Sequence, residues 1–165
     1  MTRSALALLA LLCCFPLAAD DGSWRLVGQA QLKVLFWPVY DSRLYSVDGA
    51  YREGQRPLRL QIHYLRDVDA SDLVENTQSE WEHLPDVHPE SEQWLQQLSK
   101  MWPDVRVDDV LEVVLDEQGS STFLVNGQSI GGIEDPQFGR HFLNIWLSPD
   151  TSRPELRLAL IGGAG

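Results

Sequence analysis

The chain has almost no cysteine. Its two cysteines, Cys13 and Cys14, are adjacent and lie in an apolar segment near the start of the 165-residue sequence. If that segment is removed, as the next paragraphs argue, the remaining protein has no thiol. That absence would exclude disulfide bonds, thiolate catalysis and cysteine-based metal sites together.

Long apolar runs and basic residues are also scarce. The apolar run at residues 5–12 is shorter than the ~20 residues that a membrane-spanning helix needs. We therefore expect no stable membrane span once this segment is cleaved. Lys and Arg number 13 against 24 Asp and Glu, which gives a formal net charge of -11. Such an acidic surface disfavours nucleic acid and anionic membrane surfaces as partners.

Several catalytic and metal-binding patterns are missing as well. The sequence has no Gly-x-Ser-x-Gly elbow and no phosphate-loop pattern after its glycine pairs. His83 and His88 flank a break between two predicted helices, and His63 and His141 are remote in sequence. They do not form the three or four converging ligands of a zinc site. We therefore predict no metal site and no cofactor, and we assign no catalytic residue.

The N-terminal segment has the pattern of a secretory signal. Arg3 precedes the apolar run, and the small residues Ala18 and Ala19 come directly before acidic sequence. This arrangement predicts a signal peptide at residues 1–19 that is cleaved after Ala19, with one domain at residues 20–165. The protein would then be periplasmic or secreted. An uncleaved anchor is an alternative. Lipidation is disfavoured because lipoprotein processing needs a small residue just before the modified cysteine, and the residues before the two cysteines are Leu12 and Cys13.

The apolar periodicity predicts strands, two helices, strands and two more helices in that order. The predicted strands are residues 26–35, 39–47, 58–65, 110–115, 122–125 and 128–130, and the predicted helices are residues 71–84, 89–102, 136–147 and 154–161. Residues 34–37 are expected to be a buried apolar run that Pro38 interrupts, and Asp69 or Ser71 is expected to cap the first helix. The order predicts an α+β fold in which an antiparallel sheet is covered on one face by helices.

Sequence blocks spread over nearly the whole domain resemble the chalcone isomerase-like family, specifically its exported bacterial branch. The blocks are residues 28–45, 60–64, 73–81 and 142–148 with 151–157, and their order and spacing carry the resemblance. The resemblance implies an open-faced β-sandwich with a ligand cleft between the sheet and the helices. In plant chalcone isomerases this cleft closes a flavanone ring, and in non-catalytic relatives it holds fatty acids.

The catalytic positions of the plant enzymes are mostly not matched. Their first-strand arginine has no counterpart, although Lys33 lies near that position and keeps the charge without the guanidinium fork. Their threonine on the next strand corresponds to Tyr40, and their helical tyrosine corresponds to Asp69. Asn76 matches the family's asparagine, whereas the last threonine corresponds to Leu156. We therefore expect no chalcone isomerase activity.

The leading hypothesis is an exported, non-catalytic protein that binds a small apolar ligand, a fatty acid or an aromatic molecule. The resemblance assigns the ligand-binding role to Lys33, Tyr40, Asp69, Asn76 and Trp81, the last of which matches an aromatic residue in the family's helix. The strands around residues 36–45 and the helix with Trp146 would complete the lining. Lys33 or one of the C-terminal arginines Arg140, Arg153 and Arg157 would meet an acidic group, although these arginines could equally balance the acidic surface.

Two other hypotheses stay open at this point. One is an isomerase- or lyase-type enzyme of unknown substrate in which Tyr40, Asp69 and Asn76 converge on one pocket. The other is a periplasmic interaction protein that has an exposed apolar patch and no pocket. Glu80 lies toward the apolar side of its predicted helix, where a carboxylate could act as an acid or base or could simply reach solvent. The sequence does not indicate an oligomeric state.

Overall fold

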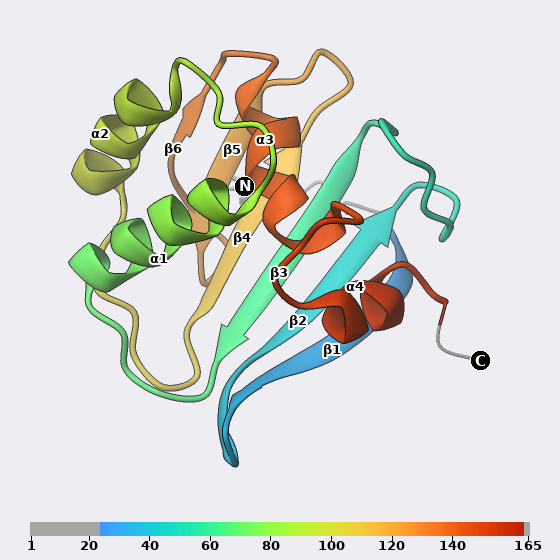
Figure 1. Ribbon diagram of the computed structural model, residues 1–165, viewed down its shortest axis with the longest axis horizontal. Helices are drawn as coiled ribbons and strands as arrows, with labels where there is room; N and C mark the ends of the chain where they lie inside the picture. Colours follow the sequence, from blue (N-terminus) through green and yellow to red (C-terminus); the bar gives the residue numbers. More distant parts are fainter. Residues whose placement is uncertain (1–23, 164–165) are drawn as a thin grey trace, which may run out of the picture.

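The computed structural model describes residues 24–163, so the predicted signal peptide at residues 1–19 and its cleavage site lie outside the described part. Six strands form one antiparallel sheet in which the strand order follows the chain order (Figure 1). They are β1 (Arg25–Val34), β2 (Trp37–Ser46), β3 (Leu58–Tyr64), β4 (Val110–Leu115), β5 (Ser121–Val125) and β6 (Gln128–Ile133).

The helices lie on one face of the sheet (Figure 1). They are α1 (Ala70–His83) and α2 (Ser91–Met101), which connect β3 to β4, and α3 (Phe138–Leu147) and α4 (Pro154–Leu160), which follow β6. This arrangement confirms the predicted α+β fold, an open sheet with one face covered by helices.

The alternation of β3 shows why the sheet has one apolar face. Leu58, Leu60 and Ile62 are buried, whereas Arg59 and Gln61 between them are only half-buried. Because successive side chains in a strand point to opposite faces, the leucines and isoleucine lie against the helices and the polar residues lie on the uncovered face. The period-two prediction for this segment is confirmed.

The uncovered face also carries a buried carboxylate. Glu112 on β4 is 4% exposed and accepts hydrogen bonds from Arg59 Nε at 2.7 Å and from Gln61 Nε2 at 2.9 Å. Tyr45 donates in turn to Gln61 Oε1 at 3.0 Å. This network compensates the cost of burying a charge on a sheet face that no helix covers.

Aromatic rings fill the centre between the sheet and the helices. Trp81 of α1 packs against Trp94 of α2 with ring centroids 6.0 Å apart, and both rings contact Phe138 of α3. These contacts are edge-to-face, the geometry that aromatic quadrupoles favour. Trp81 is only 1% exposed, so this residue belongs to the core.

The prediction of a buried run at residues 34–37 is wrong. These residues form the tip of the β1–β2 hairpin, where Leu35 is 85% exposed and Phe36 is 92% exposed. Pro38 does not interrupt a strand, because β2 begins at Trp37 and contains Pro38 near its start, a position that strands tolerate. An apolar run has the same sequence pattern whether it is covered or projects beyond the sheet, which explains the error.

The start of α1 also differs from the prediction. Asp69 occupies the N-cap position but its side chain makes no capping hydrogen bond. Instead, the backbone N–H of Ala70 donates to the carboxylate of Asp104 at 2.9 Å. A residue distant in sequence therefore satisfies the helix terminus, and local sequence could not indicate it. In the part of the chain that the structure describes, no helix is both long enough and apolar enough to cross a membrane.

Candidate ligand-binding site

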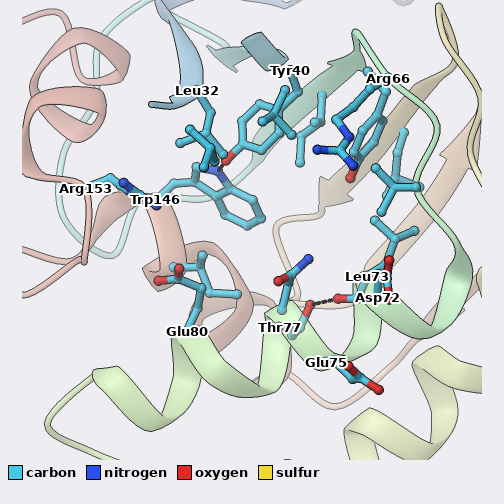
Figure 2. Close-up of a pocket in the computed structure, with 18 of the residues that line it drawn as sticks. Leu32, Tyr40, Arg66, Asp72, Leu73, Glu75, Thr77, Glu80, Trp146 and Arg153 are labelled. Carbon is cyan, nitrogen blue, oxygen red and sulfur yellow. Dashed lines mark hydrogen bonds between the residues drawn. The ribbon is translucent and has the colours of Figure 1, made fainter. Parts of the chain in front are cut away.

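A cavity of about 380 Å³ lies between the sheet and the helices (Figure 2). This volume falls within the ~300–1,000 Å³ range of small-molecule sites. The sheet contributes Leu32, Val34, Val39, Tyr40, Ile62, Tyr64 and Leu111 to its wall. The helices and loops contribute Arg66, Asp67, Val68, Asp72, Leu73, Glu75, Asn76, Thr77, Glu80, Trp102, Phe142, Ile145, Trp146, Ser152, Arg153 and Leu156.

The strand register brings the floor of the cavity together. Tyr40 on β2 lies opposite Leu32 on β1 and opposite Tyr64 on β3. These positions are at the same end of the three strands, near the β1–β2 hairpin tip. The floor is thus a row across neighbouring strands, and α1 and α3 form the opposing walls.

Tyr40 provides a hydrogen-bond donor inside the cavity. Trp146 Nε1 donates to the Tyr40 hydroxyl oxygen at 3.0 Å (Figure 2). Among the described residues, the Tyr40 hydroxyl has no acceptor for its own proton. Burial raises the pKa of Tyr40 to about 12, and nearby Glu80 adds to this, while Trp146 and Arg153 oppose it. The phenol therefore stays protonated at neutral pH and can donate to an acceptor that enters the cavity.

Tyr64 is a second phenol beside the first. Its ring meets that of Tyr40 edge-to-face with centroids 6.0 Å apart. Burial raises the pKa of Tyr64 well above its usual value, and the neighbouring Tyr40 adds to the effect. The floor of the cavity is therefore uncharged at neutral pH.

Charged side chains line two sides of the cavity. Glu80 accepts a hydrogen bond from the Ser152 hydroxyl at 2.6 Å. Figure 2 shows Glu80 and Arg153 on the side of Trp146, with Arg66 across the cavity from them. Within residues 24–163, neither the Arg66 nor the Arg153 guanidinium has a hydrogen bond or an ion pair. Both cations can therefore receive an acidic group without breaking an existing pair.

The predicted site residues fall into two groups. Tyr40 and Asn76 line the cavity, whereas Lys33, Asp69 and Trp81 do not. Lys33 is exposed at an irregularity in the β1–β2 pairing, Asp69 is exposed at the start of α1, and Trp81 is in the aromatic core. Ligand contact by these residues stays a prediction, and the convergence of Tyr40, Asp69 and Asn76 that an enzyme was expected to need is not observed.

Some cavity residues were not predicted. Tyr64 continues the buried alternation of Leu60 and Ile62, so the period of β3 contained a signal for it. Arg66 lies in the loop after β3, and no sequence pattern indicated its position. Within the described residues, no group of three or more His, Cys, Asp or Glu is placed to hold a metal ion.

The fold and the cavity define a class of protein in which helices cover one face of an open antiparallel sheet and leave a cavity of ligand size between the two layers. Residues 19–162 match the chalcone isomerase-like family, and the chain belongs to this family. It is 27% identical over 146 residues to an uncharacterized protein of Haemophilus influenzae, which covers 88% of this chain and 71% of that protein.

A solved structure supports the same fold. The crystal structure of the Arabidopsis thaliana fatty-acid binding protein AtFAP1 is similar with a TM-score of 0.66. The similarity covers 91% of this chain and 92% of that chain at 12% sequence identity. At this identity the likeness concerns the fold.

Proposed function

We propose that this protein binds a fatty acid in the cavity between the sheet and the helices, and that it does not catalyse chalcone isomerisation. The observation that carries the proposal is a cavity with a largely apolar floor in which a buried phenol, Tyr40, has a free O–H to donate. A fatty acid combines an apolar chain with an acceptor head group, which matches both features.

The size of the cavity supports a ligand of this class. An apolar cavity of about 150 Å³ holds benzene, and this one has about 380 Å³. The fatty-acid binding protein AtFAP1 supports the same class of ligand through the shared fold. An aromatic acid of similar size is the alternative ligand.

The head group would lie near Tyr40 and Arg153. The charge of Arg153 acts on the Tyr40 hydroxyl, as the pKa of that phenol reflects. A carboxylate between them would accept the Tyr40 proton in a hydrogen bond and would lie close to an unpaired cation. The chain would then extend along the apolar side chains Leu32, Val34 and Val39.

The absence of catalysis is proposed from the residues at the family's catalytic positions. Asp69, which stands where the enzymes have a tyrosine, does not line the cavity. Leu156 lines it but has no polar side-chain atom to donate or accept a hydrogen bond. Loss of a single stabilising donor lowers the rate of an enzyme by about 10²–10³. Because donors are missing at two of the family's catalytic positions, we expect no measurable rate of chalcone isomerisation.

Titration with dodecanoic acid tests the proposal. We expect stoichiometric binding by calorimetry, and Tyr40→Phe should weaken it about ten- to a hundredfold because a hydrogen bond to a charged group is lost. Arg153→Met should weaken binding of the acid but not of dodecan-1-ol. Arg66→Met is the matched control, because Arg66 also lines the cavity but lies across it from Arg153. Absence of binding, or equal affinity in the Tyr40→Phe protein, would contradict the proposal.

We also propose that the protein acts outside the cytosol, on the basis of the predicted signal at residues 1–19. Cell fractionation with mass measurement of the isolated protein tests this. The expected result is a periplasmic or secreted protein that begins at Asp20, and a cytosolic protein that retains residues 1–19 would contradict it.

A further inference from the structure

The β1–β2 hairpin extends beyond the rest of the sheet. The register pairs of β2 with β3 begin at Tyr40, opposite Tyr64, and the Val39 carbonyl accepts one more backbone hydrogen bond from Leu65 at 2.9 Å. Among the described residues, Trp37 and Pro38 at the start of β2 have no backbone partner on the β3 side. The hairpin reaches past the other strands at the bottom of Figure 1. We call residues 34–37, at its end, the apolar tip.

The apolar tip exposes large hydrophobic side chains. Val34 is 48% exposed, Leu35 85%, Phe36 92% and Trp37 75%. Contiguous exposed apolar side chains of this size mark interaction sites more often than scattered ones do. The tip therefore presents hydrophobic surface that the fold itself does not use.

The turn conformation supports a role beyond folding. Leu35 has a φ of 57°, in the left-handed region that glycine and asparagine adopt at little cost. A leucine in this region carries backbone strain, and at 85% exposure its side chain has no burial that would compensate for it. Leu35 therefore departs from two preferences, that of leucine for a negative φ and that of a large apolar side chain for burial. Such a residue is a candidate for a function other than stabilising the fold.

The apolar tip also lacks the acids that dominate the rest of the chain. Residues 32–40 contain no Asp or Glu, although the whole sequence has 24, and their one charge is Lys33. Trp and Phe side chains are favoured at membrane–water interfaces, and a flanking lysine can remain at the head-group level. The composition fits a lipid surface rather than a charged protein groove.

The position and size of the apolar tip favour a lipid surface over a protein partner. Val34 belongs both to the tip and to the lining of the cavity, so the two apolar surfaces are continuous. A standard protein–protein interface uses about 20–30 residues a side, far more than residues 34–37 provide. We propose that the apolar tip inserts into a neutral, zwitterionic lipid surface and brings the cavity to the source of its fatty acid, an inference that rests on the proposed function.

Vesicle binding tests this proposal. We expect the protein to co-sediment with phosphatidylcholine vesicles. Vesicles with brominated acyl chains should quench part of its tryptophan fluorescence, and this quenching should be absent in the Trp37→Phe variant. The double variant Phe36→Ser/Trp37→Ser should reduce vesicle partitioning by at least about tenfold, because two large apolar side chains no longer leave water. The control is Val87→Ser/Val107→Ser, which changes exposed apolar residues elsewhere, 60% and 53% exposed, and should leave partitioning unchanged.

Two further measurements separate this inference from the proposed function. Affinity for dodecanoic acid in solution should be the same in the tip variant, whereas transfer of a fluorescent fatty acid from vesicles should slow in proportion to lost partitioning. Vesicle binding without fatty-acid binding would leave the insertion standing and contradict the proposed function. Failure of the unmodified protein to bind vesicles, equal binding by the tip variant, or a tip-dependent dimer in place of vesicle binding would overturn the insertion.

Discussion

At the scale of one residue, His141 shows how burial creates pH sensitivity. Its ring lies 4.8 Å from that of Trp81 and 5.6 Å from that of Trp94, and its Nε2 has no hydrogen-bond partner among the described residues. Burial, together with the nearby His88, lowers the pKa of His141 to about 4, while Asp86 opposes both effects. The folded protein thus favours the neutral ring, whereas the unfolded chain binds a proton near pH 6.5.

This difference predicts a loss of stability in mild acid. Because the unfolded state binds the proton first, the contribution of His141 is present above about pH 6.5 and disappears as the pH falls to about 4. We expect His141→Phe to lose less thermal stability than the parent over this interval, measured by melting temperature against pH. The matched control is His83→Gln at the exposed end of α1, and parallel curves for the parent and His141→Phe would contradict the prediction.

Arg59 and Glu112 give a second prediction at this scale. Arg59→Met leaves the Glu112 carboxylate, 4% exposed, without its cation. Breaking such a pair costs about 3–5 kcal/mol, whereas replacing both members by apolar residues is often close to neutral. Urea denaturation should therefore show a large loss for Arg59→Met and a substantial recovery for Arg59→Met/Glu112→Met. A double variant no more stable than the single one would count against this account.

At the scale of elements, α4 and β1 are joined by a very close approach at Gly28. A Cβ atom built on Gly28 would lie 2.2 Å from the carbonyl oxygen of Ala159 and 2.6 Å from that of Leu160. Both contacts are with backbone, so no side-chain rotation can relieve them. Only glycine lets the helix lie this close to the strand.

Gly28→Ala should therefore destabilise the protein by about 1–3 kcal/mol, the usual cost of overpacking. It should also weaken fatty-acid binding, since α4 carries Leu156 of the cavity wall and follows Arg153. Gly163→Ala is the control, because its nearest contact would be an ordinary 3.4 Å from the Leu158 oxygen. Denaturation and calorimetry measure both effects, and equal behaviour of the two variants would refute the close-approach argument.

Apolar periodicity predicted strands and helices well where the pattern was regular. It did not indicate which parts of the chain pack over them. The alternation of residues 58–65 and the helical stripes around Leu73 and Trp94 depend on local spacing, so the sequence contained them. Burial of residues 34–37 and the cap on α1 from Asp104 depend on tertiary arrangement. Tyr40 and Asn76 were predicted through family resemblance, whereas Arg66 enters the cavity from a loop with no pattern.

For the whole molecule, ligand binding should appear as stability. A ligand at a hundred times its dissociation constant adds about 2.7 kcal/mol to the free energy of unfolding. For a chain of this size that corresponds to a rise of roughly 5–10 °C in melting temperature. Differential scanning calorimetry with dodecanoic acid measures it, and Tyr40→Phe at the same ligand concentration should show a smaller rise. No shift at saturating ligand would contradict binding to the folded state.

The strand order has a consequence for how the chain folds. Every strand pairs with its sequence neighbour, but β3 and β4 are separated by residues 65–109, which contain α1 and α2. The pairs on either side close short loops, whereas joining β3 to β4 closes a long one at a greater cost in chain entropy. The cavity is lined by residues that precede and residues that follow the β3–β4 pairing. We therefore expect ligand binding to recover only in the last kinetic step of refolding.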